Sequence, residues 1–199
     1  MTDTSTQHSP TLSRRTLLRT GMFGVVTSAF GLLQLSAFAN TLSTATGLTT
    51  MIDALKAIGT NVTIAAAQNL ESAFASNGPF ALHLRNAELS PTDAKTLAVA
   101  LENFVPNDRQ QLISFSASYN ASMSDTGAIA LIKALPDSVD EIGLVGCALS
   151  DECGQALLEW AKNAPNLRVM CVENNNFSKT IKAQICELST QKTDLFVMV

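Results

Sequence analysis

A strand–turn–helix unit recurs along the chain and constrains its fold more than any other feature. In the clearest copy, residues 142–157, Ile142 and Leu144 alternate with smaller residues, which is typical of a short strand with one buried face. Ser150 then begins a helix that would bury Leu157. One such unit cannot enclose a core, because its strand and its helix each have a single apolar face. Copies of the unit must therefore stack beside one another.

The copies align on a serine that precedes each predicted helix. Seven positions after each serine comes a leucine or isoleucine that the helix would bury. The four serines are Ser90, Ser124, Ser150 and Ser178, and the four apolar residues are Leu97, Leu131, Leu157 and Ile185. A serine hydroxyl at this place accepts a hydrogen bond from a free N–H of the first turn, so we expect all four to cap helices. The spacings of 34, 26 and 28 residues predict an insertion after the first copy.

The two last complete copies, 139–149 and 167–177, resemble the LxxLxLxx(N/C)xL core of leucine-rich repeats. Cys147 and Asn175 take the N/C position in the turn, and residues 82–89 form a third copy with Ala87 there. The long period, with a helix after every strand, is similar to the ribonuclease-inhibitor subclass. The resemblance implies an α/β leucine-rich-repeat solenoid, a short horseshoe with parallel strands inside and helices outside.

The second copy fits the pattern in two registers. In strict register Ser116 and Ser118 take the leucine positions, and Ala121 takes the turn. A shift of one residue instead fills the apolar positions with Phe115 and Ala117 and moves Asn120 into the turn. We leave the register open and expect a bulge or loop at this place.

The first 39 residues resemble a bacterial twin-arginine (Tat) export signal. Its motif is formed by Ser13, Arg14, Arg15, Leu17 and Leu18. The resemblance implies that the chain folds in the cytoplasm and then engages the Tat translocase during export. Its destination would be the periplasm or the space outside the cell.

A cleavage pattern follows the apolar part of this signal. The small residues Ala37 and Ala39 flank Phe38, so the mature chain would begin at Asn40. The alternative is an uncleaved signal that anchors the chain in the inner membrane. The apolar run is about 18 residues and is interrupted by glycines and polar side chains, against roughly 20 for a spanning helix. This comparison favours cleavage.

The remainder divides at residue 79. Residues 40–79 predict a Ser/Thr-rich tether over 40–50 and helices over 51–58 and 62–76. Because the open side of a first repeat needs cover, we interpret the helices as an N-terminal cap; an additional degenerate repeat is the alternative. Residues 80–199 hold about four repeats and a final strand, Leu195–Val199. That strand leaves an apolar edge through which the protein could form a homo-oligomer.

The charge balance excludes one class of partner. The full chain has 13 basic and 17 acidic residues; loss of Asp3, Arg14, Arg15 and Arg19 with the signal leaves 10 and 16, a net charge of −6. Binding to nucleic acid needs a basic face that neutralises phosphates. We therefore expect no nucleic-acid partner.

The chemistry of the chain is sparse. His83 is the single histidine after residue 39, and neither a metal-binding cluster nor a glycine-rich phosphate loop is evident. Without an evident orienting partner, His83 cannot form a nucleophilic relay. We expect no enzyme activity, no cofactor, no metal and no small-molecule substrate.

Four cysteines would enter an oxidising compartment after export. None belongs to a C-x-x-C pair, and Cys153 and Cys186 lie too far apart along their helices for an unstrained bridge. We expect no disulfide, a buried structural thiol at Cys147, and an outward, free or reactive thiol at Cys171.

The outward positions of the predicted strands define a candidate binding surface. Residues between the leucines point away from the helices, into the hollow of the horseshoe. These residues are His83, Arg85, Glu141, Gly143, Val145, Val169, Cys171 and Glu173. Leucine-rich repeats commonly bind proteins on this concave face, so the resemblance implies a protein or peptide partner. The alternatives are binding through another surface, or a structural role in assembly through Leu195–Val199.

Overall fold

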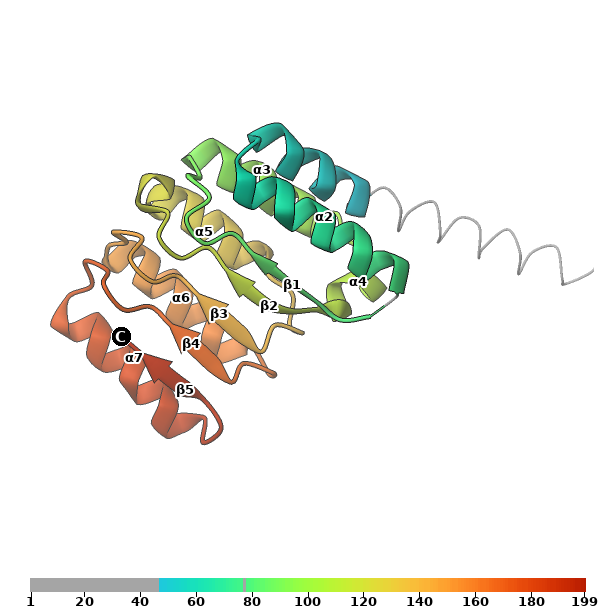
Figure 1. Cartoon of the computed structure of the whole chain (residues 1–199). Coiled ribbons are helices and arrows are strands. Elements are labelled where there is room, and N and C mark those ends of the chain that lie inside the picture. The colour runs from blue at the N-terminus through green and yellow to red at the C-terminus, as the bar shows by residue number, and fades with distance from the viewer. Residues whose placement is uncertain (1–46, 77) are drawn as a thin grey trace, which may run out of the picture. The chain divides into compact units, whose positions relative to one another are not determined.

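Five short parallel strands lie side by side in chain order in the computed structural model of the protein (Figure 1). They are β1 (Phe80–His83), β2 (Leu112–Ser116), β3 (Glu141–Gly143), β4 (Val169–Cys171) and β5 (Phe196–Met198). The structure describes residues 47–76 and 78–199, so the predicted export motif and cleavage site lie outside the described residues. The expected α/β architecture with a parallel sheet is confirmed.

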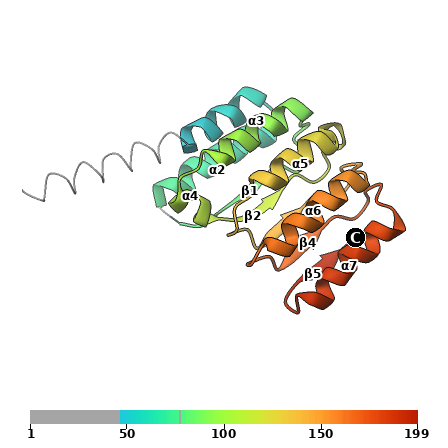
Figure 2. The same ribbon diagram turned by 180° about the vertical axis from the view of Figure 1, so that it is seen from behind.

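Helices cover one face of this sheet (Figure 2). The long helices that follow successive strands are α3 (Pro91–Glu102), α5 (Ser124–Ala134), α6 (Asp151–Asn163) and α7 (Lys179–Gln191). The predicted core positions Leu97, Leu131, Leu157 and Ile185 are fully buried between helices and strands. A short helix, α4 (Pro106–Gln111), accounts for the longer spacing after the first unit.

The second unit adopts the shifted register. Phe115 pairs with Leu82 on one side and with Ile142 on the other. Phe115 and Ala117 are therefore buried, and Asn120 occupies the turn. A 3-10 helix, η1 (Ala121–Met123), takes up the extra residue before α5. The strict register is wrong, because it would have placed serines where the core needs apolar side chains.

Asn120 joins the second unit to the first through its side-chain amide. Its Oδ1 accepts a hydrogen bond from Leu89 N–H at 3.1 Å. Its Nδ2 donates to the carbonyl oxygens of Leu84 and Ala117, both at 2.8 Å. The side chain thus satisfies backbone groups of both units that would otherwise be buried without partners.

Asn175 repeats this arrangement between the fourth unit and the third. Its Oδ1 accepts from the N–H groups of Cys147 and Leu149 at 3.0 and 3.1 Å. Its Nδ2 donates to the carbonyl oxygens of Leu144 and Val172, both at 2.8 Å. Each asparagine therefore stabilises the turn of the unit before it, and those preceding units carry Ala87 and Cys147 at the equivalent position.

Cys147 completes the series as the buried structural thiol that the sequence predicts. Its Sγ lies 3.2 Å from the carbonyl oxygen of Ala117, to which the thiol can donate. This contact joins the third unit to the second. Burial raises the pKa of the Cys147 thiol, which keeps it protonated as a donor.

Three of the four predicted serine caps are present. Ser90, Ser150 and Ser178 each accept a hydrogen bond from a backbone N–H in the first turn of their helices. Ser90 also forms a reciprocal capping box with Asp93. The prediction for Ser124 is wrong: Ser124 is itself the first residue of α5, and no side chain caps this helix. The cause is η1, which leads directly into α5.

Aspartates in the first helical turns form a second link between units. Asp125 accepts a hydrogen bond from Ser150 N–H at 2.8 Å, and Asp151 accepts from Ser178 N–H at 2.7 Å. The bonds from Ser178 lower the pKa of the Asp151 carboxyl. This stabilisation is therefore present above the ordinary pKa of aspartate and is lost as the pH falls through the lowered value.

The N-terminal part of the described chain is helical. Residues 47–58 form one helix, and α2 (Asn61–Ser76) packs against β1. Residues 47–76 contain no strand, which contradicts the additional degenerate repeat. The predicted tether is wrong for residues 47–50. The helix already begins at residue 47, where burial of Leu48 and Met51 stabilises its first turns.

No helix in the described ranges has both the length and the hydrophobicity to cross a bilayer.

Replacing Asn120 with alanine should destabilise the protein. The change leaves a buried N–H and buried carbonyl groups without partners, so we expect the free energy of unfolding to fall by about 2–4 kcal/mol. Urea denaturation measures this change. The matched control is Asn176→Ala, which removes one exposed bond to the Ala148 carbonyl and should cost less than about 1 kcal/mol. Equal losses in the two variants would contradict the role of Asn120.

Candidate binding surface

A depression of about 330 Å³ lies on the face of the sheet that the helices leave uncovered. We call this face the strand face. Every residue that the sequence predicts for the binding surface lines it: His83, Arg85, Glu141, Gly143, Val145, Val169, Cys171 and Glu173. Sequence reasoning missed six further lining residues: Ser114, Ser116, Ser118, Tyr119, Ile142 and Met198. The units thus bring together side chains that lie far apart in the sequence.

Most lining residues fall into three rows that cross the strands. The backbone pairing defines the first two rows, and hydrogen bonds that continue beyond the strand ends define the third. The first row contains Ser114, Glu141 and Val169. The second contains His83, Ser116, Gly143, Cys171 and Met198. The third contains Arg85, Ser118, Val145 and Glu173.

The missed serines come from the one unit whose register remained open. Ser114, Ser116 and Ser118 point outward only when Phe115 and Ala117 point into the core. The signal was therefore present in the shifted alignment. Tyr119 gave no comparable signal, because it lies in a turn with a positive φ of 62° and belongs to no alternating pattern.

His83 has a partner that the sequence analysis did not foresee. Its Nε2 lies 2.9 Å from Ser114 Oγ, and Ser114 donates its hydroxyl proton to Glu141 Oε2 at 3.1 Å. Because that proton is committed to Glu141, Nε2 of His83 must be the donor to Ser114. The statement that His83 lacks an orienting partner is wrong.

This order of groups differs from that of a nucleophilic relay. In such a relay the histidine lies between the nucleophile and the carboxylate and removes the hydroxyl proton. Here Ser114 lies between His83 and Glu141, and its side chain is largely buried. The bonds hold His83 in one orientation on the surface, with Nδ1 left to meet a ligand.

The middle of the depression has a floor of small residues. A Cβ atom added to Gly143 would lie 2.9 Å from Ser116 Oγ and 3.2 Å from Ser118 Oγ. Ser118 Oγ is itself held by the N–H of Val145 at 3.1 Å. The glycine therefore lets the two hydroxyl groups lie over the backbone, and no large side chain fills the centre.

Arg85 is held at one side of the depression by Tyr119. The guanidinium carbon lies 4.1 Å from the centre of the Tyr119 ring, which is a cation–π contact. The ring also lies against Gly146, where an added Cβ would come within 3.1 Å of it. Arg85 forms no ion pair with any acidic residue of the described chain. Its charge is available to a ligand.

Glu173 is the opposite charge at the far end of the third row. Its Oε2 atom is buried and has no hydrogen-bond partner within residues 47–76 and 78–199. A carboxylate oxygen that is removed from water without a donor carries a desolvation cost. The residue as a whole is only half-buried and lines the depression, so a cationic group of a ligand can pair with its carboxylate.

Cys171 lies among acidic side chains in the depression. It lies in the second row, between the carboxylates of the first and third rows. Burial, followed by the charges of Glu173 and Glu141, raises the pKa of its thiol. Cys171 is a free thiol, in line with the first alternative predicted, and the raised pKa argues against the reactive alternative because the thiolate is the nucleophile.

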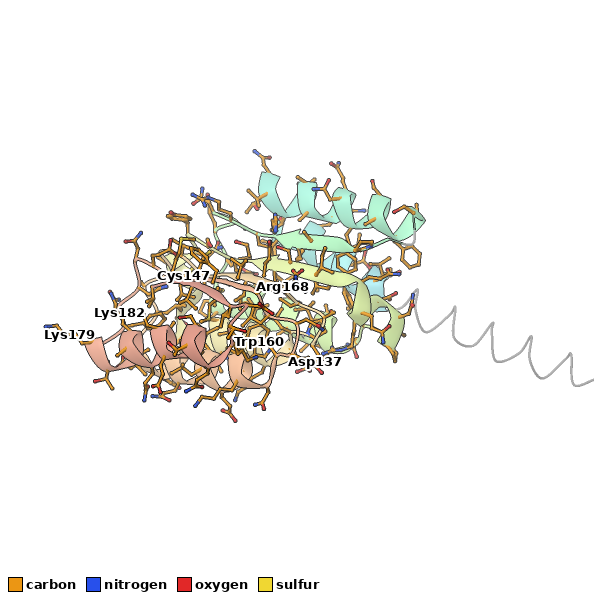
Figure 3. The ribbon with its side chains drawn as sticks, turned by 90° about the horizontal axis from the view of Figure 1, so that it is seen from below. Asp137, Cys147, Trp160, Arg168, Lys179 and Lys182 are labelled. Atoms are coloured by element: carbon orange, nitrogen blue, oxygen red, sulfur yellow. The ribbon has the colours of Figure 1, made fainter. Side chains whose placement is uncertain are left out.

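All four cysteines are free thiols. Cys147 and Cys153 are buried, and burial is the main cause that raises the pKa of Cys153 to about 12. Cys186 is exposed on α7. Figure 3 shows Lys179 and Lys182 projecting from the same helix, and neither lysine lines the depression.

Comparison with known proteins gives no match: neither a family model nor a curated protein is similar to the chain. Within the described ranges, no three histidine, cysteine, aspartate or glutamate residues come close enough to hold a metal ion. Function is therefore inferred from the surface itself.

Alkylation should distinguish Cys171 from Cys186. At pH 7.5 we expect iodoacetamide to modify the exposed Cys186 before Cys171, because the raised pKa of Cys171 leaves little thiolate. Raising the pH should accelerate the reaction of Cys171, and Glu173→Gln should accelerate it at constant pH. Peptide mapping by mass spectrometry measures both rates. Modification of Cys171 before Cys186 would contradict this interpretation.

Proposed function

We propose that the chain is an exported leucine-rich-repeat protein of the ribonuclease-inhibitor-like subclass that binds a protein or peptide through its strand face. The observation that carries the proposal is the depression, which collects all eight residues chosen from the outward strand positions. Its surface combines charged, hydroxyl and small apolar groups, which suits recognition of a polypeptide with mixed side chains.

The stacking of the units supports the proposed repeat class. The strands are parallel and follow chain order, and asparagine or cysteine side chains bond to the backbone of the preceding unit in three of the turns. Repeat proteins with this serial arrangement present an extended binding face made of one or two residues from each unit. The rows of the depression have this composition.

We propose export in the folded form through the Tat translocase, to the periplasm or beyond. The support for this route is the arginine motif at Arg14 and Arg15. The uncleaved, membrane-anchored form remains the alternative location.

Capture of partners tests the binding function. Tagged wild-type protein is incubated with cell-envelope extract beside a variant with His83→Glu, Arg85→Glu and Glu173→Arg. The matched control carries Gln155→Glu, Lys162→Glu and Glu159→Arg on the exposed side of α6, so both variants change the net charge equally.

We expect quantitative mass spectrometry to find a partner that wild type and control retain and that the first variant loses by at least about tenfold. The loss follows from removing charges at both ends of the depression. Thermal denaturation confirms that both variants fold. Equal capture by all three proteins would contradict binding through the strand face.

Assembly is the second candidate function, and the exposed edge of β5 favours it. Phe196 is 59% exposed and Met198 is 38% exposed. Phe196 N–H and Met198 C=O bond to β4, so the intervening Val197 directs its backbone groups away from the sheet. An edge of this kind can pair with a strand of a second molecule.

Sedimentation velocity at two protein concentrations tests this candidate. Assembly through β5 predicts a mass that rises with concentration in wild type. It also predicts a monomer in Val197→Pro, because proline removes the outward N–H without breaking a bond to β4. The conservative control Val197→Thr should assemble like wild type. A wild-type monomer at both concentrations would exclude the assembly function.

A further inference from the structure

Opposite charges lie at the two ends of the third row, and neither forms an ion pair within the described chain. Arg85 is fixed over the ring of Tyr119 but pairs with no carboxylate. Glu173 has a buried carboxylate oxygen that accepts no hydrogen bond. A ligand complementary to this row must bring an anionic group to Arg85 and a cationic group to Glu173.

The strand spacing sets the distance between the backbone positions of Arg85 and Glu173. Arg85 lies beside Ser118, Ser118 beside Val145, and Val145 beside Glu173, as the backbone hydrogen bonds between these segments show. Three strand-to-strand steps of about 4.8 Å place the backbones of Arg85 and Glu173 about 14 Å apart. An extended peptide advances about 3.4 Å per residue, so side chains four residues apart lie about 14 Å apart and point to the same side.

We propose that the strand face recognises an extended peptide segment that crosses the strands and carries an acidic and a basic side chain four residues apart. The acidic side chain pairs with Arg85 and the basic one with Glu173. This inference rests on the proposed binding function and specifies the chemistry of its partner.

The centre of the row determines what lies between the two charges. The residue midway along the segment faces Ser118 and Val145. Ser118 Oγ accepts from the Val145 N–H and also lies 3.3 Å from Ser116 Oγ, with which it shares a hydrogen bond, and the valine is half-buried. Beside them, Gly143 leaves the floor of the depression without a large side chain. The midway residue is therefore apolar, and the depression has room for it.

Titration with synthetic peptides tests the inference. The reference peptide is acetyl-Thr-Ser-Glu-Thr-Val-Thr-Lys-Ser-Thr-amide, which has its Glu and Lys four residues apart and β-branched residues that favour an extended chain. Further peptides move the Lys to spacings of two, three and six. Two more place Glu or Lys at both charged positions. Each is titrated into the ¹⁵N-labelled full chain, and amide shifts give the Kd and the site.

The decisive result is a change in which peptide each variant prefers when one charged residue of the third row is reversed. Wild type should bind the Glu–Lys peptide of spacing four at least about fivefold tighter than the other spacings. Glu173→Arg should instead prefer the Glu–Glu peptide, and Arg85→Glu the Lys–Lys peptide, each by about tenfold. Glu159→Arg, which makes the same charge change on α6, should keep the wild-type preference.

The experiment distinguishes a failure of this inference from a failure of the proposed binding function. Amide chemical-shift changes on the strand face that depend on neither the spacing nor the charge of the peptide's side chains would overturn this inference. They would still support the proposed binding surface. An absence of binding to all peptides at millimolar concentration would also overturn it, whereas the partner-capture experiment would still decide the proposed function. Shifts confined to the helices would count against both.

Discussion

The hydrogen bonds from the turn asparagines to the preceding unit are the interaction on which the rest of the structure depends. The amide of Asn120 or Asn175 provides an acceptor and a donor at the point where the chain leaves a strand and cannot continue a sheet ladder. Backbone groups buried in such a turn need partners, and a side-chain amide meets both kinds. The units that receive these bonds have a small residue, Ala87 or Cys147, at the equivalent turn position.

The alignment of the outward rows follows from this stacking. When each turn is bonded to the one before it, successive strands keep the same register, and residues at equivalent positions lie beside one another. The depression is thus a consequence of register and needs no dedicated loop. A slip of one residue would turn Arg85 or Glu173 into the core.

Much of the fold and of the surface could be predicted because burial alternates along each strand. Ile142 and Leu144 had to point inward, which sent Gly143 and Val145 outward. The second unit could not be resolved from local pattern, because serine is tolerated both in a turn and on a strand. Only the burial of Phe115 between Leu82 and Ile142 selects its register. The ring contact of Tyr119 with Arg85 depends on a turn with positive φ that no periodicity encodes.

Hydrogen exchange of two backbone amides tests whether the turn asparagines hold the units together. The N–H groups of Leu89 and Leu149 lie in turns outside the strands, yet both bond to an asparagine Oδ1. If these bonds hold the units together, both amides should exchange only through global unfolding. Their free energy of opening should equal that of the Leu144 amide, which bonds to the carbonyl oxygen of Cys171 in β4. Exchange at the rate of exposed loop amides would contradict the account.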